Sequence, residues 1–250
     1  MKGRLMYWTL IRIAAAVTAL SGVVAGFIVN VDRAARQGHH LGAVLANYFS
    51  LFTIISSLLS VVVLVAAATW WQRHPGTSPE PMRIALGMAA VAGPVILLGL
   101  VYNALLRGLP SEAALGDSAG IALLDSYAID VLHVVMPIYF VLDLLLAPRR
   151  RGLPWWSLGV IVGYPLAWTA YTMIRGELVA NPDGSTAWWY PYPFLDPHEA
   201  GGYGSALTYI GAILAAFLVI GIGMITIGRY REKRAAVRAG SAPAVGWLVH

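Results

Sequence analysis

The feature that most constrains this chain is a series of six apolar runs, each long enough to cross a membrane. The hydrocarbon core of a bilayer is about 30 Å thick, which about 20 helical residues span. The runs cover about residues 7–29, 47–69, 82–106, 124–147, 154–178 and 206–227. Since lipid offers backbone groups no hydrogen-bond partner, such runs must be helical. The sequence therefore predicts an all-α integral membrane bundle of six transmembrane helices.

Composition supports this class and excludes several kinds of site. The chain is 58% hydrophobic and 12% charged, whereas soluble domains are about a quarter charged. It contains no cysteine, which rules out disulfides, thiolate nucleophiles and cysteine metal sites. His39 and His40 form a lone pair without a spaced third ligand, so no metal site and no cofactor are predicted. The basic residues cluster beside the apolar runs, a pattern that favours membrane lipids over nucleic acid as partners.

The distribution of basic residues predicts the topology. If both termini lie on one side, 13 of the 17 basic residues share that side, and only Arg33, Arg36, Arg107 and Arg175 lie on the other. Positive residues favour the cytoplasmic side, so we expect a multi-pass protein of the cell membrane with both termini cytoplasmic. Residues 1–230 form one predicted domain, and residues 231–250 a basic, frayed tail. The oligomeric state is left open.

Two polar positions lie at depth in this predicted bundle. Asp130 and His133 are one turn apart in the fourth run, where charged and polar groups are costly and often functional. The second run, taken as one continuous helix, places Ser50, Thr53, Ser57 and Ser60 on a single face. Both runs enter from the outer side, which places Thr53 about 9 Å and His133 about 14 Å below the surface. These groups either pack two helices together or form a site.

Further polar and aromatic residues converge on the outer half of the bundle. Tyr102 and Asn103 end the third run, and Arg175 ends the fifth, where we expect it to reach the outer headgroups. The loop 179–205 follows, and its aromatic residues are candidates for the mouth of a site: Trp189, Tyr190, Tyr192 and Phe194. The segment 30–46 is predicted to be a polar loop. Together these features predict a cavity that opens outward under an aromatic cover.

The chemistry that such a cavity can support requires a nucleophile and a base. Without cysteine, a hydroxyl is the available nucleophile, and histidine can take its proton near neutral pH. Thr53 or Ser57 would pair with His133, Asp130 would orient the imidazole, and Asn103 or Tyr102 would stabilise an oxyanion. The alternative is a non-catalytic lipid or small-molecule binding or transport protein. The lack of an internal repeat or an obviously broken helix pair argues against the known transporter plans.

Four motifs resemble a known family. They are LFTIISSLL at residues 51–59, VYNALL at 101–106, LHVVMP at 132–137 and WYPYPFLD at 189–196. In this order they resemble the bacterial six-span Pr-six-Pr membrane proteins, over about residues 7–230. Those are similar to the eukaryotic androgen-induced and androgen-dependent TFPI-regulating membrane proteins.

The resemblance implies an activity. Its eukaryotic members are membrane hydrolases that use a threonine and a histidine to cleave esters of fatty acids with hydroxy fatty acids. By motif, the threonine matches Thr53 and the histidine matches His133. Ser57 stands where many bacterial members carry asparagine. The resemblance therefore predicts an intramembrane threonine-type hydrolase of lipid esters.

Overall fold

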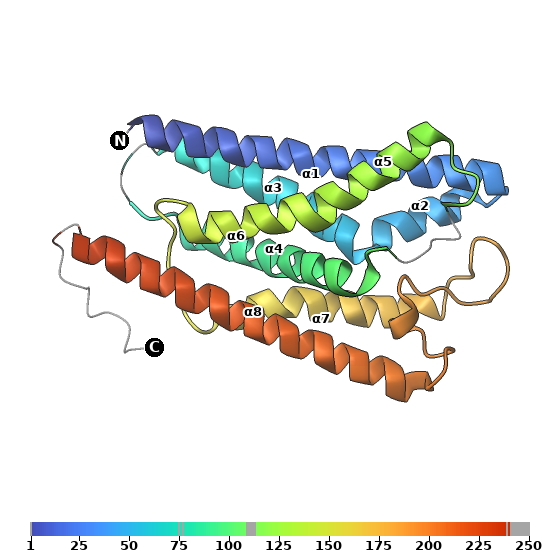
Figure 1. Cartoon of the computed structure of the whole chain (residues 1–250). Helices are drawn as coiled ribbons and strands as arrows, with labels where there is room; N and C mark the ends of the chain where they lie inside the picture. The colour runs from blue at the N-terminus through green and yellow to red at the C-terminus, as the bar shows by residue number, and fades with distance from the viewer. Residues whose placement is uncertain (1, 75, 77, 109–113, 239, 241–250) are drawn as a thin grey trace.

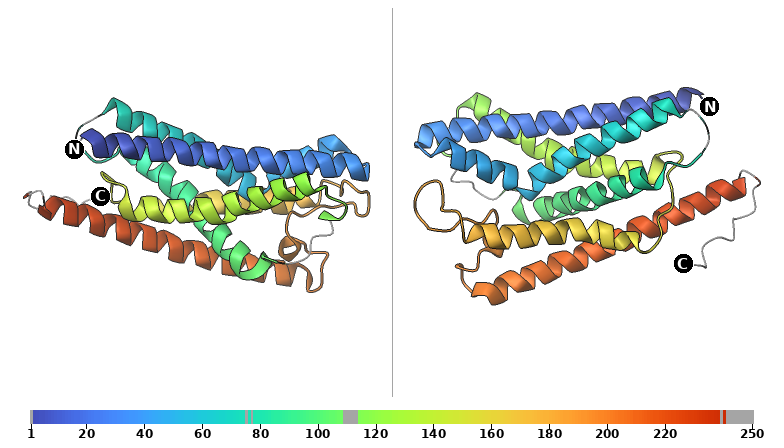
Figure 2. Two further views of the ribbon diagram at one scale, coloured as in Figure 1. Left: turned by 45° about the horizontal axis from the view of Figure 1, so that its top comes forward. Right: turned by 180° about the vertical axis from the view of Figure 1, so that it is seen from behind.

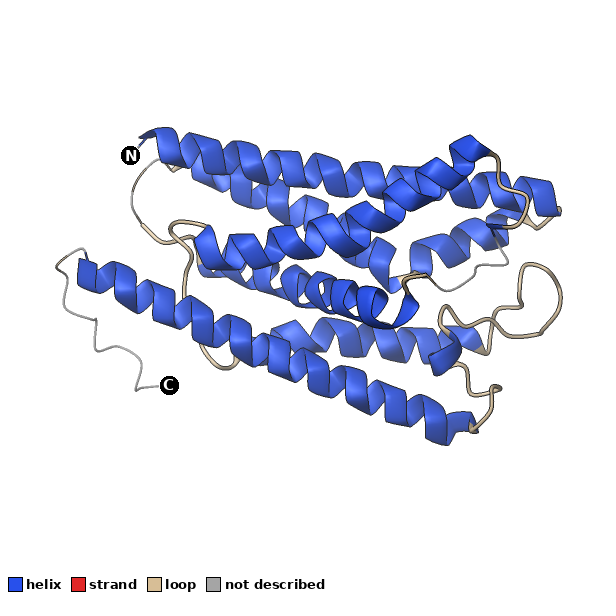
Figure 3. Ribbon diagram, viewed as in Figure 1, coloured by secondary structure: helices blue, strands red, loops and turns tan. Residues whose placement is uncertain are grey.

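The computed structural model describes residues 2–74, 76, 78–108, 114–238 and 240, and within these residues it contains helices and loops but no strand (Figures 1 and 3). In chain order the elements are α1 (Lys2–Gln37), α2 (Leu41–Ser50), α3 (Phe52–Arg73), α4 (Met82–Val101), η1 (Tyr102–Leu106), α5 (Ala119–Asp130), η3 (Val131–Val135), α6 (Met136–Leu146), α7 (Ser157–Gly176), η4 (Pro193–Leu195) and α8 (Gly202–Arg238). The segments η1 and η3 are π-helical, and η4 is a 3-10 turn.

Six of these helical segments are long and apolar enough to cross a membrane, which confirms the all-α, six-span prediction. They are Tyr7–Gln37, Phe52–Arg73, Met82–Ala104, Ala119–Leu146, Ser157–Gly176 and Gly202–Val237. α1 begins and α8 ends at the same end of the bundle, which we call the terminal end (Figure 1). The opposite end, which carries α2 and the loop between α7 and α8, is called the loop end.

Helix α4 lies at the centre of the bundle. It packs against α3, α6, α7 and α8, and 56% of its apolar window is buried against protein, compared with 22% for α8 (Figure 2). One hydrophobic cluster joins α1, α3, α4 and α6. A second cluster joins α7 and α8 to the start of α3 through Phe52, Trp168 and Phe217. The functional site described below lies in this second cluster.

The segment 30–46, predicted to be a loop, is mostly helical. α1 continues to Gln37, and α2 begins at Leu41 with the His40 Nδ1 accepting a hydrogen bond from the Ala43 amide at 3.2 Å. Ion pairs stabilise the polar end of α1, because Arg33 binds Asp117 and Asp125, both at 2.7 Å. Short-range polarity suggested a loop here, and long-range ion pairs override it.

At the other end of the chain, α8 continues to Arg238, past the expected boundary at residue 230. The first eight residues of the predicted tail are therefore helical instead of frayed. Residues 239 and 241–250 of that tail lie outside the described residues. At 1.5 Å per residue α8 is about 55 Å long, so it extends well beyond a hydrocarbon core of about 30 Å.

The second apolar run is not one continuous helix. Leu51 is extended, with φ −60° and ψ 134°, and separates α2 from α3. The free carbonyls at this break are satisfied by the Trp168 Nε1, which donates to the Ser50 oxygen at 2.9 Å, and by the Ser50 hydroxyl, which donates to the Asn47 oxygen at 2.7 Å. The break therefore gives α3 a new amino end, whose first amides have no acceptor in the preceding turn.

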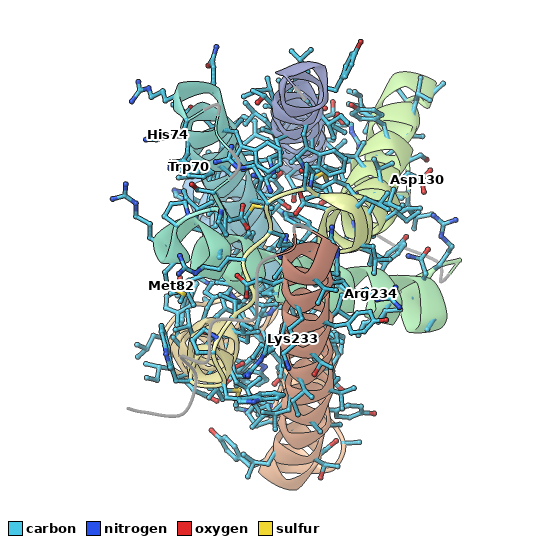
Figure 4. The ribbon with its side chains drawn as sticks, turned by 90° about the vertical axis from the view of Figure 1, so that its left-hand side faces the viewer. Trp70, His74, Met82, Asp130, Lys233 and Arg234 are labelled. Atoms are coloured by element: carbon cyan, nitrogen blue, oxygen red, sulfur yellow. The ribbon has the colours of Figure 1, made fainter. Side chains whose placement is uncertain are left out.

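The terminal end, which faces the viewer in Figure 4, contains a buried network of four charged side chains. Arg12 is fully buried and binds Asp143 at 3.2 Å and Glu80 at 3.4 Å, while Arg150 binds the other oxygen of Asp143. Arg12 also stacks over the Trp71 ring at 4.6 Å. The two cations and two anions balance, which makes their burial tolerable.

Candidate functional site

A narrow cavity lies between α3, α4, α7 and α8 toward the loop end. The centres of water-sized spheres can occupy about 90 Å³ of it, and all of the space between its lining atoms, including the open mouth, is about 850 Å³. The polar side chains of its lining are few, and apolar and aromatic residues form most of the wall. The polar and aromatic lining residues are Phe52, Thr53, Tyr102, His133, Trp168, Thr169, Tyr192, Phe194 and Phe217.

Thr53 and His133, the two residues that the sequence put forward for chemistry, both line this cavity. They also lie at similar heights along the bundle, as their neighbours on α1 indicate. Gly22 of α1 packs against Val131 and Leu132, next to His133 in sequence. Gly26, one turn further along α1, packs against Tyr48, five residues before Thr53. The second and fourth runs therefore bring a hydroxyl and an imidazole to one pocket. Within the described part of the chain, no direct hydrogen bond joins the two side chains.

Thr53 owes its position to the break at Leu51. It is the second residue of α3, and its side chain is buried. No side chain caps this helix start. The Thr53 amide is thus one of the first amides of α3, which an α-helix leaves without an internal acceptor.

Tyr192 of the aromatic loop reaches this helix start. Burial raises the pKa of the Tyr192 hydroxyl, and hydrogen bonds from the Thr53 side chain and backbone partly offset that rise. The ring is held between Trp168, at 6.0 Å between centroids, and Phe194, at 5.3 Å. The loop therefore forms part of the cavity wall and brings the Tyr192 hydroxyl close to Thr53.

His133 lies in the π-helical segment η3, with its ring stacked on Tyr102 at 4.4 Å between centroids. Its Nδ1 lies 3.2 Å from the carbonyl oxygen of Ile129. Since a carbonyl can only accept, Nδ1 carries the proton in this contact, and Nε2 keeps its lone pair. This tautomer is the one a general base requires.

The two π-helical segments share a contact that explains their form. Pro137 has no amide to give to the carbonyl of His133, four residues earlier. Asn103 of η1 replaces it: its Nδ2 donates to the His133 oxygen and to the Gly99 oxygen, both at 2.8 Å. A Cβ on Gly99 would lie 2.5 Å from the Pro137 ring, so only glycine permits this approach. π-Helical turns of this kind are frequent at functional sites.

Two predicted roles fail in this geometry. Asp130 does not orient His133: it pairs with Arg107, its side chain is 61% exposed, and it lies at the periphery of the bundle (Figure 4). A charged arginine is a stronger partner for a carboxylate than a neutral imidazole. Asn103 is not a free oxyanion donor, because both of its contacts are to backbone carbonyls. Ser57 is buried but does not line the cavity.

A second, lipid-facing groove lies between α4 and α6. Asn103, Pro137, Ile138 and Val141 line it, and His133 is the residue it shares with the cavity. The imidazole and its Tyr102 neighbour thus stand between the interior cavity and the lipid.

Hydrogen bonds hold the remaining residues of the cavity mouth at the loop end. Trp189 donates its amide to the Gly176 oxygen at 3.0 Å. The Tyr190 hydroxyl donates to Glu177 at 2.8 Å, and this bond, with those from His198 and Tyr203, lowers the pKa of Glu177. Arg175 does not reach outward as expected: its Nη2 donates to the Asn47 Oδ1 at 2.7 Å, and it lies 5.3 Å from the Trp189 ring.

Sequence reasoning missed two residues at the site and two in the terminal-end network. Trp168 lines the cavity and caps α2, yet nothing in its apolar run marks it. Asn47 binds Arg175, and its one sequence signal is a polar side chain at the edge of an apolar run. Glu80 and Arg12 form the terminal-end network; an arginine inside the first run was the available signal.

Fold and cavity together define the class: a multi-pass helical membrane protein with an apolar interior cavity that carries a threonine and a histidine. No protein-family model matches the chain, and comparison with curated proteins and with solved structures finds no similar one. The family resemblance therefore stays a prediction. Among the residues that the structure describes, no group of three His, Asp or Glu side chains is placed to hold a metal ion.

Proposed function

We propose that this protein is an intramembrane hydrolase of lipid esters, with Thr53 as the nucleophile and His133 as the general base. The observation that carries the proposal is that these two residues, from separate helices, line one narrow apolar cavity. An apolar wall suits acyl chains, and a hydroxyl and an imidazole that line the same cavity are the groups that acyl transfer requires. We further propose that both termini are cytoplasmic and that the protein resides in the cell membrane, because the basic residues favour the terminal end.

The reaction would proceed in two steps. The Thr53 oxygen attacks the ester carbonyl while its proton passes to the His133 Nε2, directly or through one water. The tetrahedral intermediate collapses, the alcohol leaves with the proton from His133, and an acyl-threonine remains. Water then attacks the acyl group, His133 takes the water proton, and the fatty acid departs from a regenerated threonine.

The developing oxyanion needs donors near Thr53. The first amides of α3 are unused in the helix, and Tyr192 lies against the Thr53 amide. We assign the Thr53 amide and the Tyr192 hydroxyl as the oxyanion donors, with the substrate carbonyl taking the place that the phenol oxygen now holds beside the amide. Tyr102 lines the same cavity but is stacked on His133, which favours a role in fixing the ring.

A fluorophosphonate probe tests this proposal. The wild-type protein should be labelled, Thr53→Ala should not be, and His133→Ala should lose labelling rate and esterase activity by about 100-fold or more. Thr69→Ala is the matched control, because Thr69 lies on the same helix, is exposed and bonds only its own turn. Equal labelling of wild type and Thr53→Ala would show that Thr53 is not the nucleophile.

The alternative is a lipid-binding or transport protein without turnover. The absence of a direct Thr53–His133 hydrogen bond among the described residues, together with the contact of Thr53 with Tyr192, favours it. In that case fatty-acyl ligands would bind to the purified protein, but no probe labelling would depend on Thr53. The two proposals thus separate in one experiment.

A further inference from the structure

The loop end carries a cation whose charge is not neutralised by any residue the structure describes. Arg175 is half-buried near the end of α7, and its hydrogen bond to the neutral Asn47 uses one of its five N–H donors. The aromatic face of Trp189 covers it from one side. The nearby Glu177 is engaged by Tyr190 and by other loop residues instead.

Asn47 supplies a second free donor at the same place. It is 5% exposed, and its Nδ2 is buried without a hydrogen-bond partner. The orientation of the amide is set chemically, because Arg175 can only donate and must face the oxygen. The unpaired NH₂ group therefore belongs to the same amide that touches the guanidinium. A buried donor of this kind calls for an acceptor.

This pair of donors lies close to the cavity, although neither residue is part of its lining. Trp168, a cavity residue, lies seven residues before Arg175 on α7, so the two share a face about 10 Å apart along the helix. The loop that places Trp189 over Arg175 goes on to place Tyr192 in the cavity wall. The apolar part of a ligand with its charge at Arg175 is therefore within reach of the cavity, about 10 Å away along α7.

We propose that Arg175 and the Asn47 amide form an anion site for the carboxylate or phosphate headgroup of a single-chain lipid whose tail occupies the cavity. A guanidinium and an amide NH₂ match the in-plane lone pairs of either anion and give charge-assisted hydrogen bonds. The site concerns binding and does not depend on whether Thr53 is a nucleophile.

The test measures binding of tritiated ligands to the purified full-length protein in phosphatidylcholine nanodiscs at about pH 8. The probes are oleate, lysophosphatidate and oleyl alcohol, which is the neutral control with the same chain as oleate. Oleate, lysophosphatidate or both should bind at least about tenfold more tightly than oleyl alcohol, and the one that does so identifies the headgroup. Equal affinity of all three would overturn the proposal, as would displacement of bound oleate by 10 mM inorganic phosphate alone.

Three variants locate the site. Arg175→Gln removes the cation, and Asn47→Asp supplies a permanent carboxylate to Arg175 while keeping the side-chain shape; both should abolish the tenfold preference. Asn47→Asp adds an ion pair, so it addresses the concern that Arg175→Gln fails to fold. Arg36→Gln is the control, since Arg36 already pairs with Asp32 and Asp117. A preference that survives in Asn47→Asp refutes the site. The readout is binding of intact ligands, which needs no turnover, so failure of the proposed hydrolysis would leave this result unchanged.

Discussion

Asn103 provides the sharpest test of how the His133 segment is held. Its amide faces the lipid groove, yet it donates to the carbonyls of His133 and Gly99 at 2.8 Å each. Pro137 cannot supply the amide that a regular helix would give to the His133 oxygen. Asn103→Leu keeps the size of the side chain and removes the donor, which leaves that carbonyl without its substitute partner in a setting without water.

The cost follows from the number of groups affected. One acceptor left unsatisfied costs about 1–3 kcal/mol. For a protein of this size 1 kcal/mol corresponds to about 2–4 °C, so the apparent Tm in detergent should fall by about 2–12 °C. Pro137→Ala restores an amide four residues after His133. The double variant Asn103→Leu/Pro137→Ala should therefore recover most of the loss, with a coupling energy of about 1 kcal/mol or more.

Thermal unfolding of the four proteins in this cycle, followed by fluorescence-detected size exclusion, gives the measurement. Asn103→Leu with the Tm of wild type would show that the contact does not stabilise the segment. Strictly additive changes in the double variant would show that Asn103 does not stand in for the missing amide of Pro137.

Three more outcomes are expected. Arg12→Met leaves an excess buried negative charge and should lower the free energy of unfolding by about 3–5 kcal/mol. The double variant Arg12→Met/Glu80→Gln restores the charge balance and should recover most of the lost Tm. A double variant with the same Tm as Arg12→Met would contradict this role of the network. The pKa of Glu177 is lowered from its ordinary value of 4.5, so its contacts stabilise the aromatic loop above that pH and are lost as the pH falls through the folded value. Pepsin cleavage of residues 188–194 should rise steeply below about pH 4 in the wild type, and Glu177→Gln should already be cleaved at about pH 4.5. Equal pH profiles of cleavage for the two proteins would show that Glu177 does not hold the loop. Gly22→Ala would bring a Cβ to 2.7 Å from Val131 of η3 and should destabilise the protein by about 1–3 kcal/mol. The control Gly211→Ala meets nothing within 4 Å and should stabilise α8 slightly. Equal Tm changes in the two variants would contradict close packing of α1 against η3.

The membrane spans could be predicted because hydropathy alone decides them. Lipid excludes unpaired backbone, so an apolar run of sufficient length has no structure open to it but a helix. The same reasoning places Thr53 and His133 in neighbouring helices of one half of the bundle, where the structure has them line one cavity. These inferences depend on local composition and on length, which a single sequence contains.

The details that shape the cavity depend on distant residues and were not predictable. Leu51 is flanked by Ser50 and Phe52, with no proline or glycine to mark a break, and the break is satisfied by Trp168, 118 residues from Ser50. Asp130 is one turn from His133, which suggested a pair, but Arg107 takes its carboxylate from another loop. Such competition between partners is decided by tertiary structure, not by spacing.

The buried network at the terminal end has a consequence for how the chain is made. Arg12 leaves the ribosome 131 residues before Asp143, its partner. At about 5–20 residues per second this interval is on the order of 10 s, and for about its first half Glu80, which is 68 residues from Arg12, has not been made either. Arg12 lies within two turns of the start of its span at Tyr7, so its long side chain can reach the headgroups while it waits. The network needs Asp143 of the fourth span, so we expect it to close only after that span has entered the membrane.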